Sequence, residues 1–126
     1  MIEESCLIDT DILSYILKKR EPVYQNACDY LGIHKKYIVS CITYYECIRG
    51  YKVVGAVKRL EAFHAFLNIT DVLYLDSSIL EKAGEIYGLL KKSGELKGEF
   101  DILIGATAII NGLTLVTNNE RHYEPL

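Results

Sequence analysis

The sequence predicts an α/β fold in three layers, α/β/α, with a central parallel sheet of four or five strands. Short apolar runs with strand character alternate with segments of helical periodicity, which is the order of a parallel sheet with right-handed crossovers. The chain has 126 residues and half of them are apolar, enough for the core of a single domain that spans positions 1–126. One late segment, residues 100–112, is apolar almost throughout, so we expect it to be covered on nearly every side.

The first strand is predicted at residues 5–9, SCLID, where an apolar run ends in an acid. A helix follows over residues 10–19. Its apolar residues recur on one helical face: Ile12, Leu13, Ile16 and Leu17. Pro22 opens a second amphipathic helix that reaches about Gly32, since proline is tolerated in a first helical turn. Residues 37–40, YIVS, form the second predicted strand.

A helical hairpin is predicted in the middle of the chain. Residues 42–51 have helical spacing, the pattern loosens at residues 53–55, and the spacing resumes over residues 56–68. The apolar run VLYL at residues 72–75 then forms the third predicted strand.

The last third of the chain contains two predicted helices and a strand. Three residues offer N-cap side chains for the first of these helices: Asp76, Ser77 and Ser78. The helix covers residues 79–92, with Glu81 three residues after Ser78 as in a capping box, and Gly94 ends it. Residues 100–112 form the buried central helix, which closes on an Asn-Gly pair, and TLVT at residues 114–117 is the fourth strand.

The charge of the chain argues against a broad basic surface. Fourteen Lys and Arg stand against 17 Asp and Glu, so the formal charge is −3, whereas domains that bind nucleic acid by phosphate neutralisation alone are basic. No run approaches the roughly 18 apolar residues that span a bilayer. The N-terminal MIEESCLID carries acids where a secretory signal needs Lys or Arg. We therefore expect a soluble cytoplasmic protein with no membrane association.

The four cysteines are predicted to be buried free thiols: Cys6, Cys28, Cys41 and Cys47. They show no CxxC pair and stand among apolar or aromatic neighbours. A zinc or redox role is the alternative, but only three histidines accompany the cysteines. A reducing compartment suits this pattern better than an oxidising one.

Polar side chains fall where the predicted strands end, which is the edge at which open parallel sheets collect ligand sites. Asp9 follows the first strand and residues 117–119 follow the last. Ser40 ends the second strand shortly before Glu46, and Asp101 starts the buried helix. Carboxylate oxygens suit Mg²⁺ or Mn²⁺, which acidify a bound water and stabilise charge on a scissile phosphate. Convergence of the three acids would therefore make a metal site for phosphoryl chemistry.

Each acid also has a structural interpretation. Asp9, or Asp11 beside it, is a suitable N-cap for the first helix. Asp101 gains from the dipole of a helix N-terminus. Two arginines are candidate ion-pair partners of Glu46: Arg49 and Arg59. On local grounds both interpretations stay open for every one of these acids.

Three segments of the chain resemble the PIN-domain ribonuclease toxins of the VapC kind. LIDTDILSYIL resembles their opening strand and first acid, and ITYYECIRGY resembles the segment with their second acid. GEFDILIGATAIINGLTLVTNN resembles their third acid and final strand. The segments occur in the family's order, and the likeness covers nearly all of the chain. The resemblance implies a PIN-like fold and a metal-dependent endoribonuclease that is the toxin of a toxin–antitoxin pair.

Carried over residue by residue, the resemblance implies that Asp9, Glu46 and Asp101 hold Mg²⁺ or Mn²⁺. Many members carry a fourth acid near the end of the last strand, where this chain has residues 117–119, TNN. The resemblance thus places a neutral amide, Asn119, in the catalytic site and favours one tightly held ion. It also implies three partners, namely an RNA substrate, a cognate antitoxin protein and a second copy in a homodimer.

Other functions remain compatible with the pattern. A PIN-like module that binds RNA or a protein without cleaving it would use the acids structurally. An RNA-processing nuclease outside a toxin–antitoxin pair would use the same chemistry. A phospho-accepting receiver domain is disfavoured because the last strand leads into residues 117–119 without the lysine that such a domain needs.

Overall fold

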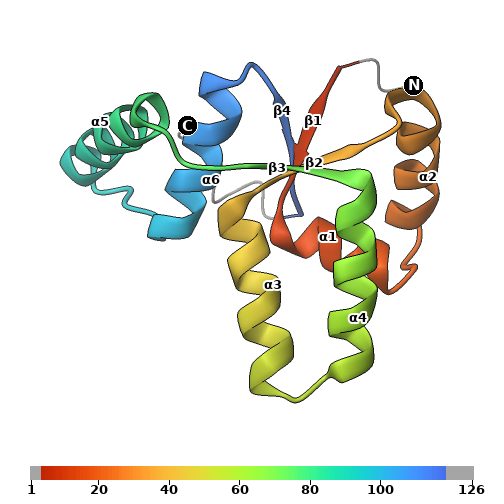
Figure 1. Ribbon diagram of the computed structural model, residues 1–126. Coiled ribbons are helices and arrows are strands. Elements are labelled where there is room, and N and C mark those ends of the chain that lie inside the picture. The colour runs from red at the N-terminus through yellow and green to blue at the C-terminus, as the bar shows by residue number, and fades with distance from the viewer. Residues whose placement is uncertain (1–3, 119–126) are drawn as a thin grey trace.

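The computed structural model describes residues 4–118, and within them the predicted α/β class is confirmed (Figure 1). The strands are β1 (Cys6–Ile8), β2 (Tyr37–Ser40), β3 (Thr70–Leu73) and β4 (Thr114–Val116). The helices are α1 (Thr10–Leu17), α2 (Val23–His34), α3 (Cys41–Val53), α4 (Val57–Phe66), the short 3-10 helix η1 (Leu67–Ile69), α5 (Ser77–Ser93) and α6 (Glu99–Ile110). No helix within residues 4–118 is long and apolar enough to cross a membrane.

The strands form two parallel pairs that lie side by side in the middle layer. β1 pairs with β4, with Leu7 opposite Leu115, and β2 pairs with β3, with Val39 opposite Val72. β1 also contacts β2, which gives the spatial order β4, β1, β2, β3. The segments that leave β1 and β2 at their carboxyl ends are therefore neighbours, and they carry Asp9 and Glu46.

Alternating strand side chains separate the core into two faces, as the two-residue period of a strand requires. Cys6, Ile8 and Val39 belong to the cluster shared with α1, α2 and α4, where Phe63 is fully buried. The intervening side chains pack with α6 on the opposite face: Leu7, Ile38, Leu73 and Leu115. Both faces of the strand layer are thus covered by helices, as the sequence predicted.

α6 is the central helix of the molecule, as predicted. Ile104 packs toward the strands, whereas Ile102 and Ala106 pack against α5. The cover ends before the last turn of α6, because Ile109 is 44% exposed and Ile110 is 39% exposed. The expectation of cover on nearly every side is therefore wrong for this final turn.

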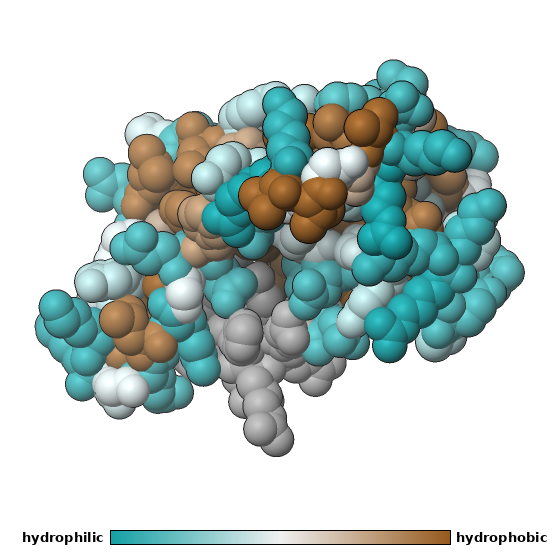
Figure 2. All heavy atoms as spheres, turned by 90° about the horizontal axis from the view of Figure 1, so that it is seen from below, coloured by the Kyte–Doolittle hydropathy of each residue, from teal (hydrophilic) through white to brown (hydrophobic). Residues whose placement is uncertain are grey.

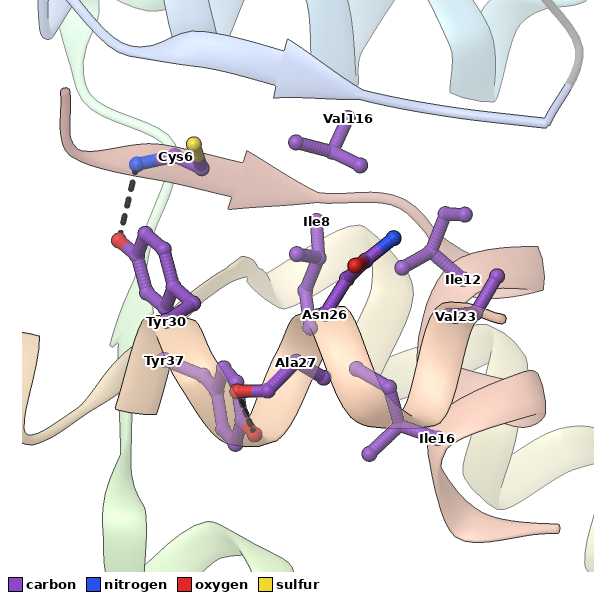
Figure 3. Close-up of a pocket in the computed structure, with 10 residues that line it drawn as sticks. All are labelled: Cys6, Ile8, Ile12, Ile16, Val23, Asn26, Ala27, Tyr30, Tyr37 and Val116. Carbon is purple, nitrogen blue, oxygen red and sulfur yellow. Dashed lines mark hydrogen bonds between the residues drawn. The ribbon is translucent and has the colours of Figure 1, made fainter. Parts of the chain in front are cut away.

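α2 is attached to the strand layer by two tyrosine hydroxyls (Figure 3). Tyr30 accepts a hydrogen bond of 2.9 Å from the backbone N–H of Cys6, and Tyr37 donates one of 2.8 Å to the carbonyl of Ala27. Between α1, α2 and the β1–β4 pair lies a cavity of about 130 Å³ with a largely apolar lining. Carboxylates are absent from the lining that the structure describes, so this cavity is separate from the acids.

Most element boundaries differ from the prediction by one or two residues, and two of the differences have a visible cause. β3 begins at Thr70 rather than at residue 72, because Thr70 pairs with Tyr37 and its hydroxyl donates to the carbonyl of Phe66. α5 begins at Ser77, because Asp76 provides the N-cap: its side chain accepts a hydrogen bond of 2.9 Å from the N–H of Ile79. The alternative cap at Ser78, with its capping box, is not used.

The cysteine prediction is correct in part. All four thiols are free, and Cys6 and Cys47 are buried. Burial raises the pKa of the Cys47 thiol to about 12, with a further contribution from Glu46. Cys41 is half-buried and Cys28 is exposed, so burial was predicted wrongly for Cys28. Neighbouring helix positions point about 100° apart, and it is Ala27 that faces the core.

Candidate metal centre

Asp9 follows β1 and is 4% exposed. Its Oδ1 accepts a hydrogen bond of 2.9 Å from the backbone N–H of Ile12, so Asp9, rather than Asp11, caps α1. Its Oδ2 accepts a short hydrogen bond from the hydroxyl of Thr117, just beyond β4. The structural interpretation of Asp9 is therefore confirmed, and the same carboxylate joins the ends of two strands.

The environment of Asp9 disfavours its charge. Burial raises the pKa of this carboxyl, while the hydrogen bonds from Thr117 and the Ile12 N–H lower it. The charges of Asp11 and Asp101 raise it further. A buried carboxylate that other acids repel is stabilised by a bound cation, which reverses both unfavourable effects.

Glu46 lies on the second turn of α3, and its side chain is 24% exposed. Its Oε1 accepts a hydrogen bond of 2.8 Å from the hydroxyl of Thr10, the residue next to Asp9. Its Oε2 lies 4.0 Å from Nη2 of Arg49, so Arg49 is the ion-pair partner that the structure provides. Glu46 thus retains an ion-pair role while its other oxygen is held toward the start of α1.

Asp101 lies in the first turn of α6 and is half-buried. This helix has no side-chain cap, because its N-cap residue is Gly98. A carboxylate here benefits from the helix dipole, as the structural interpretation required. Its charge also contributes to the raised pKa of Asp9, so the two carboxylates interact electrostatically.

The three acids supply suitable donors for a hard divalent cation. Each carboxylate oxygen can accept from two directions, so the hydrogen bonds on Asp9 and Glu46 leave lone pairs for a metal. Within residues 4–118, no three His, Cys, Asp or Glu side chains already lie at ligand spacing. Two carboxylates about 4 Å apart repel by roughly 4 kcal/mol at an effective dielectric near 20, so a closer set of acids would need a cation to stabilise it. The oxygen donors of these residues fit Mg²⁺ or Mn²⁺ in chemistry.

Just after β4, where many members of the resembling family carry a fourth acid, this chain has the hydroxyl of Thr117. Thr117 donates a hydrogen bond to Asp9, and the side-chain amide of Asn118 donates one of 3.2 Å to the hydroxyl of Tyr15. Asn119, the predicted neutral member of the site, lies outside the described residues.

Comparison with known proteins identifies the family. The PIN domain family model matches residues 6–125. The chain belongs to the PIN domain family. Ribonuclease VapC1 of Methanocaldococcus jannaschii is 33% identical over 124 residues, which cover 98% of this chain and 82% of that relative. Ribonuclease VapC2 of Haemophilus influenzae is also 33% identical, and the match covers 94% of this chain and 89% of the relative.

Two solved VapBC structures agree with the fold. The DNA-bound VapBC of Salmonella typhimurium superposes with a TM-score of 0.84 at 25% identity, over 96% of this chain and 91% of that one. VapBC-1 of nontypeable Haemophilus influenzae gives a TM-score of 0.80 at 26% identity, over 94% and 90% of the two chains. The resemblance that the three sequence motifs indicated is therefore confirmed, as is the PIN-like three-layer fold.

Threonine hydroxyls are the part of this PIN site that the sequence interpretation missed. Thr10 donates to Glu46 and contacts the hydroxyl of Thr43 at 3.2 Å, which joins the carboxyl ends of β1 and β2. Thr117 was considered only as a substitute for an acid, yet it holds Asp9. The available signal was position, because Thr10, Thr43 and Thr117 all stand within three residues of the end of a strand.

Proposed function

We propose that this protein is a divalent-metal-dependent endoribonuclease and the toxin of a toxin–antitoxin pair. One observation supports the proposal: Asp9, Glu46 and Asp101, which come from distant segments, are linked near the carboxyl end of β1 by a hydrogen bond and by charge. Asp9 is buried there, Glu46 is joined to its neighbour Thr10, and the charge of Asp101 reaches Asp9. The VapC ribonucleases that are 33% identical support RNA as the substrate.

In this proposal, Asp9, Glu46 and Asp101 hold one Mg²⁺ or Mn²⁺ ion. The bound ion supplies the charge that acidifies a water and stabilises the scissile phosphate. Thr10 keeps Oε1 of Glu46 in place and Thr117 keeps Oδ2 of Asp9 in place. Hydrogen bonds from such outer residues orient ligands and lower the entropy lost on binding the ion.

We also propose an antitoxin protein and a second copy of this chain as partners. The VapBC assemblies of Salmonella typhimurium and Haemophilus influenzae, which this chain resembles, support the antitoxin. The tip of the α3–α4 hairpin supports association, because Val53, Val54 and Val57 are 80%, 74% and 64% exposed. Figure 2 shows hydrophobic groups at the end of the molecule where this hairpin terminates. Exposed apolar clusters of this kind are typical of protein interfaces.

The test is cleavage of single-stranded and structured RNA by the purified protein with Mg²⁺ or Mn²⁺. We expect cleavage that excess EDTA abolishes. Asp101→Asn should keep the fold and lose activity by orders of magnitude, because an amide lacks the charge that balances the metal. Asp71→Asn is the matched control, since Asp71 is an exposed carboxylate in β3 whose side chain pairs with Lys36.

Cleavage that persists in excess EDTA would contradict the metal requirement. Cleavage by Asp101→Asn at nearly the original rate would leave Asp101 with its helix-dipole role alone. Metal-loaded protein that binds RNA without cutting any substrate would instead support a non-catalytic binding module, in which Asp9 is only a cap and Glu46 only a partner of Arg49.

A further inference from the structure

We propose that Tyr45, Arg49 and Phe100 bind one nucleotide of the RNA beside the acids, with Arg49 on a phosphate and Tyr45 against a base. These three residues are called here the α3–α6 platform. The inference rests on the proposed ribonuclease function and concerns how that site holds its substrate. It adds a positioning surface to the three acids and assigns its residues separate tasks.

The platform joins the two helices that carry Glu46 and Asp101. Tyr45 on α3 and Phe100 on α6 meet edge to face, with ring centroids 5.9 Å apart and an interplanar angle of 87°. The guanidinium of Arg49 lies over both rings, 5.2 Å from the centroid of Tyr45 and 5.5 Å from that of Phe100. Each aromatic residue directly precedes one of the acids in the sequence. Arg49 also approaches Glu46 at 4.0 Å, so a nucleotide on the platform is next to the proposed metal centre.

Arg49 is available to a phosphate. Its side chain is 49% exposed, and its contact with Glu46 is a single approach of 4.0 Å rather than a bidentate pair. Such half-exposed ion pairs are weak, so exchanging Glu46 for a phosphate loses little. If Glu46 turns to a metal ion, Arg49 also loses that partner. A guanidinium held over aromatic rings remains able to donate in two parallel bonds to phosphate oxygens.

Tyr45 presents an exposed aromatic ring. Its exposed fraction is 51%, whereas Thr43 and Cys47, two positions before and after it on α3, are buried. Proteins bind unpaired bases by stacking them on aromatic side chains or on arginine planes, and the platform combines both groups. The chain carries a net charge of −3, so a local cation beside the acids is needed to hold a phosphate there.

The experiment measures binding of a fluorescent single-stranded RNA oligonucleotide to full-length protein in the Asp101→Asn background, across a range of salt concentrations. Arg49→Ala should weaken binding and reduce the slope of log affinity against log salt by about 0.7, the value for one phosphate contact on a single strand. Arg49→Lys should retain the slope, because its charge remains, while binding more weakly than arginine.

Tyr45→Leu should weaken binding about 5- to 150-fold, the range expected for one stacked base, and leave the salt slope unchanged. Two control variants remove the same groups elsewhere. Lys36→Ala removes a cation that precedes β2, at the opposite end of the strand from Glu46. Tyr87→Leu removes a tyrosine of α5 that has a lysine, Lys91, 6.0 Å from its ring centroid. Neither control should change RNA affinity.

The outcomes separate this inference from the function on which it rests. Unchanged affinity and slope in Arg49→Ala and Tyr45→Leu, in a protein that cleaves RNA, would overturn the platform and leave the ribonuclease intact. The predicted slope change in a protein that never cleaves would support the platform and overturn the ribonuclease. Loss of antitoxin binding with RNA binding unchanged would assign the surface to a protein partner and overturn the inference.

If Arg49 and Tyr45 only stabilised the fold, substituting them would change the melting temperature of the protein. Arg49→Lys and Tyr45→Leu are therefore melted alongside the parent protein. Equal melting temperatures with altered RNA binding support the platform. A lowered melting temperature in Arg49→Ala, together with no loss of RNA affinity in the stably folded Arg49→Lys and Tyr45→Leu proteins, would overturn it.

Discussion

At the scale of single residues, the acids of the proposed site have structural contacts besides their proposed role as metal ligands. Asp9 caps α1 through Ile12 and is also the proposed first metal ligand. Glu46 contacts Arg49 and is held by Thr10. The cap and the ligand are therefore compatible interpretations, because a carboxylate has enough lone pairs for both.

Asp9→Asn separates the two tasks. Asparagine caps helices about as well as aspartate, so α1 keeps its N-cap. Burial raises the pKa of Asp9, so its contribution to stability is complete below the unfolded pKa and is lost as pH rises through the folded pKa. The wild-type protein loses that contribution as pH rises, whereas the variant does not ionise. We expect the variant without metal to melt at the same temperature or higher at pH 7, with a smaller advantage at pH 4.

Bound Mg²⁺ should reverse the order of the two melting temperatures, so that the wild-type protein melts above Asp9→Asn. Wild-type protein with Mg²⁺ at 100 times its Kd gains about 2.7 kcal/mol of unfolding free energy, and Asp9→Asn should gain far less. Melting curves with and without Mg²⁺ at both pH values measure these differences, with Asp71→Asn as the control carboxylate. A variant without metal that melts well below wild type at pH 7 would show that the Thr117 hydrogen bond outweighs the burial of charge.

At the scale of secondary structure elements, the α3–α4 hairpin shows how a turn residue acts. The helices pack against each other, with Tyr44 of α3 meeting the buried Phe63 of α4 edge to face at 5.5 Å. Gly55 closes the hairpin with a φ of +66°, a left-handed conformation that other residues adopt at a cost. The loosened pattern at residues 53–55 predicted this turn.

Gly55→Ala should lower the unfolding free energy by about 1 to 2 kcal/mol, since no contact is lost and only the backbone conformation is penalised. Gly84→Ala is the matched control in the interior of α5, where an added Cβ meets nothing within 4 Å. It should raise the unfolding free energy by about 0.5 to 1 kcal/mol. Urea denaturation measures both, and equal effects of the same sign would contradict the conformational argument.

At the scale of the whole molecule, the exposed apolar residues of the hairpin tip leave surface for a partner. We expect the protein to sediment at tens of micromolar with twice the 14.3 kDa mass of the chain. Val53 and Val54 are exposed in the single chain, so we expect that their burial between two copies would favour such association. A single species at the chain mass across this range would contradict the homodimer.

Val54→Lys locates the interface. At 74% exposure this residue contributes little to the folded chain, so the melting temperature of the monomer should not change. If the hairpin tip lies between the copies, the substitution buries a charge there and shifts sedimentation toward the monomer. Unchanged sedimentation would place the dimer interface on another surface.

The sequence by itself determined the order of the elements, the hairpin and the motifs that identify the PIN family. These depend on local periodicity, on turn residues and on acids near the ends of apolar runs, all of which are visible within short stretches. Boundaries were less certain, since the start of β3 follows from its register with β2 and the start of α5 from a choice among three capping residues.

Only the tertiary structure decided which groups meet. Thr10 reaches Glu46 across 36 positions and Thr117 reaches Asp9 across 108, and no pattern within one segment contains such a contact. The same reason selected Arg49 over Arg59 as the partner of Glu46 and placed Arg49 over Phe100. Contacts between distant segments depend on how the helices pack on the strands, which is set by burial over the whole core.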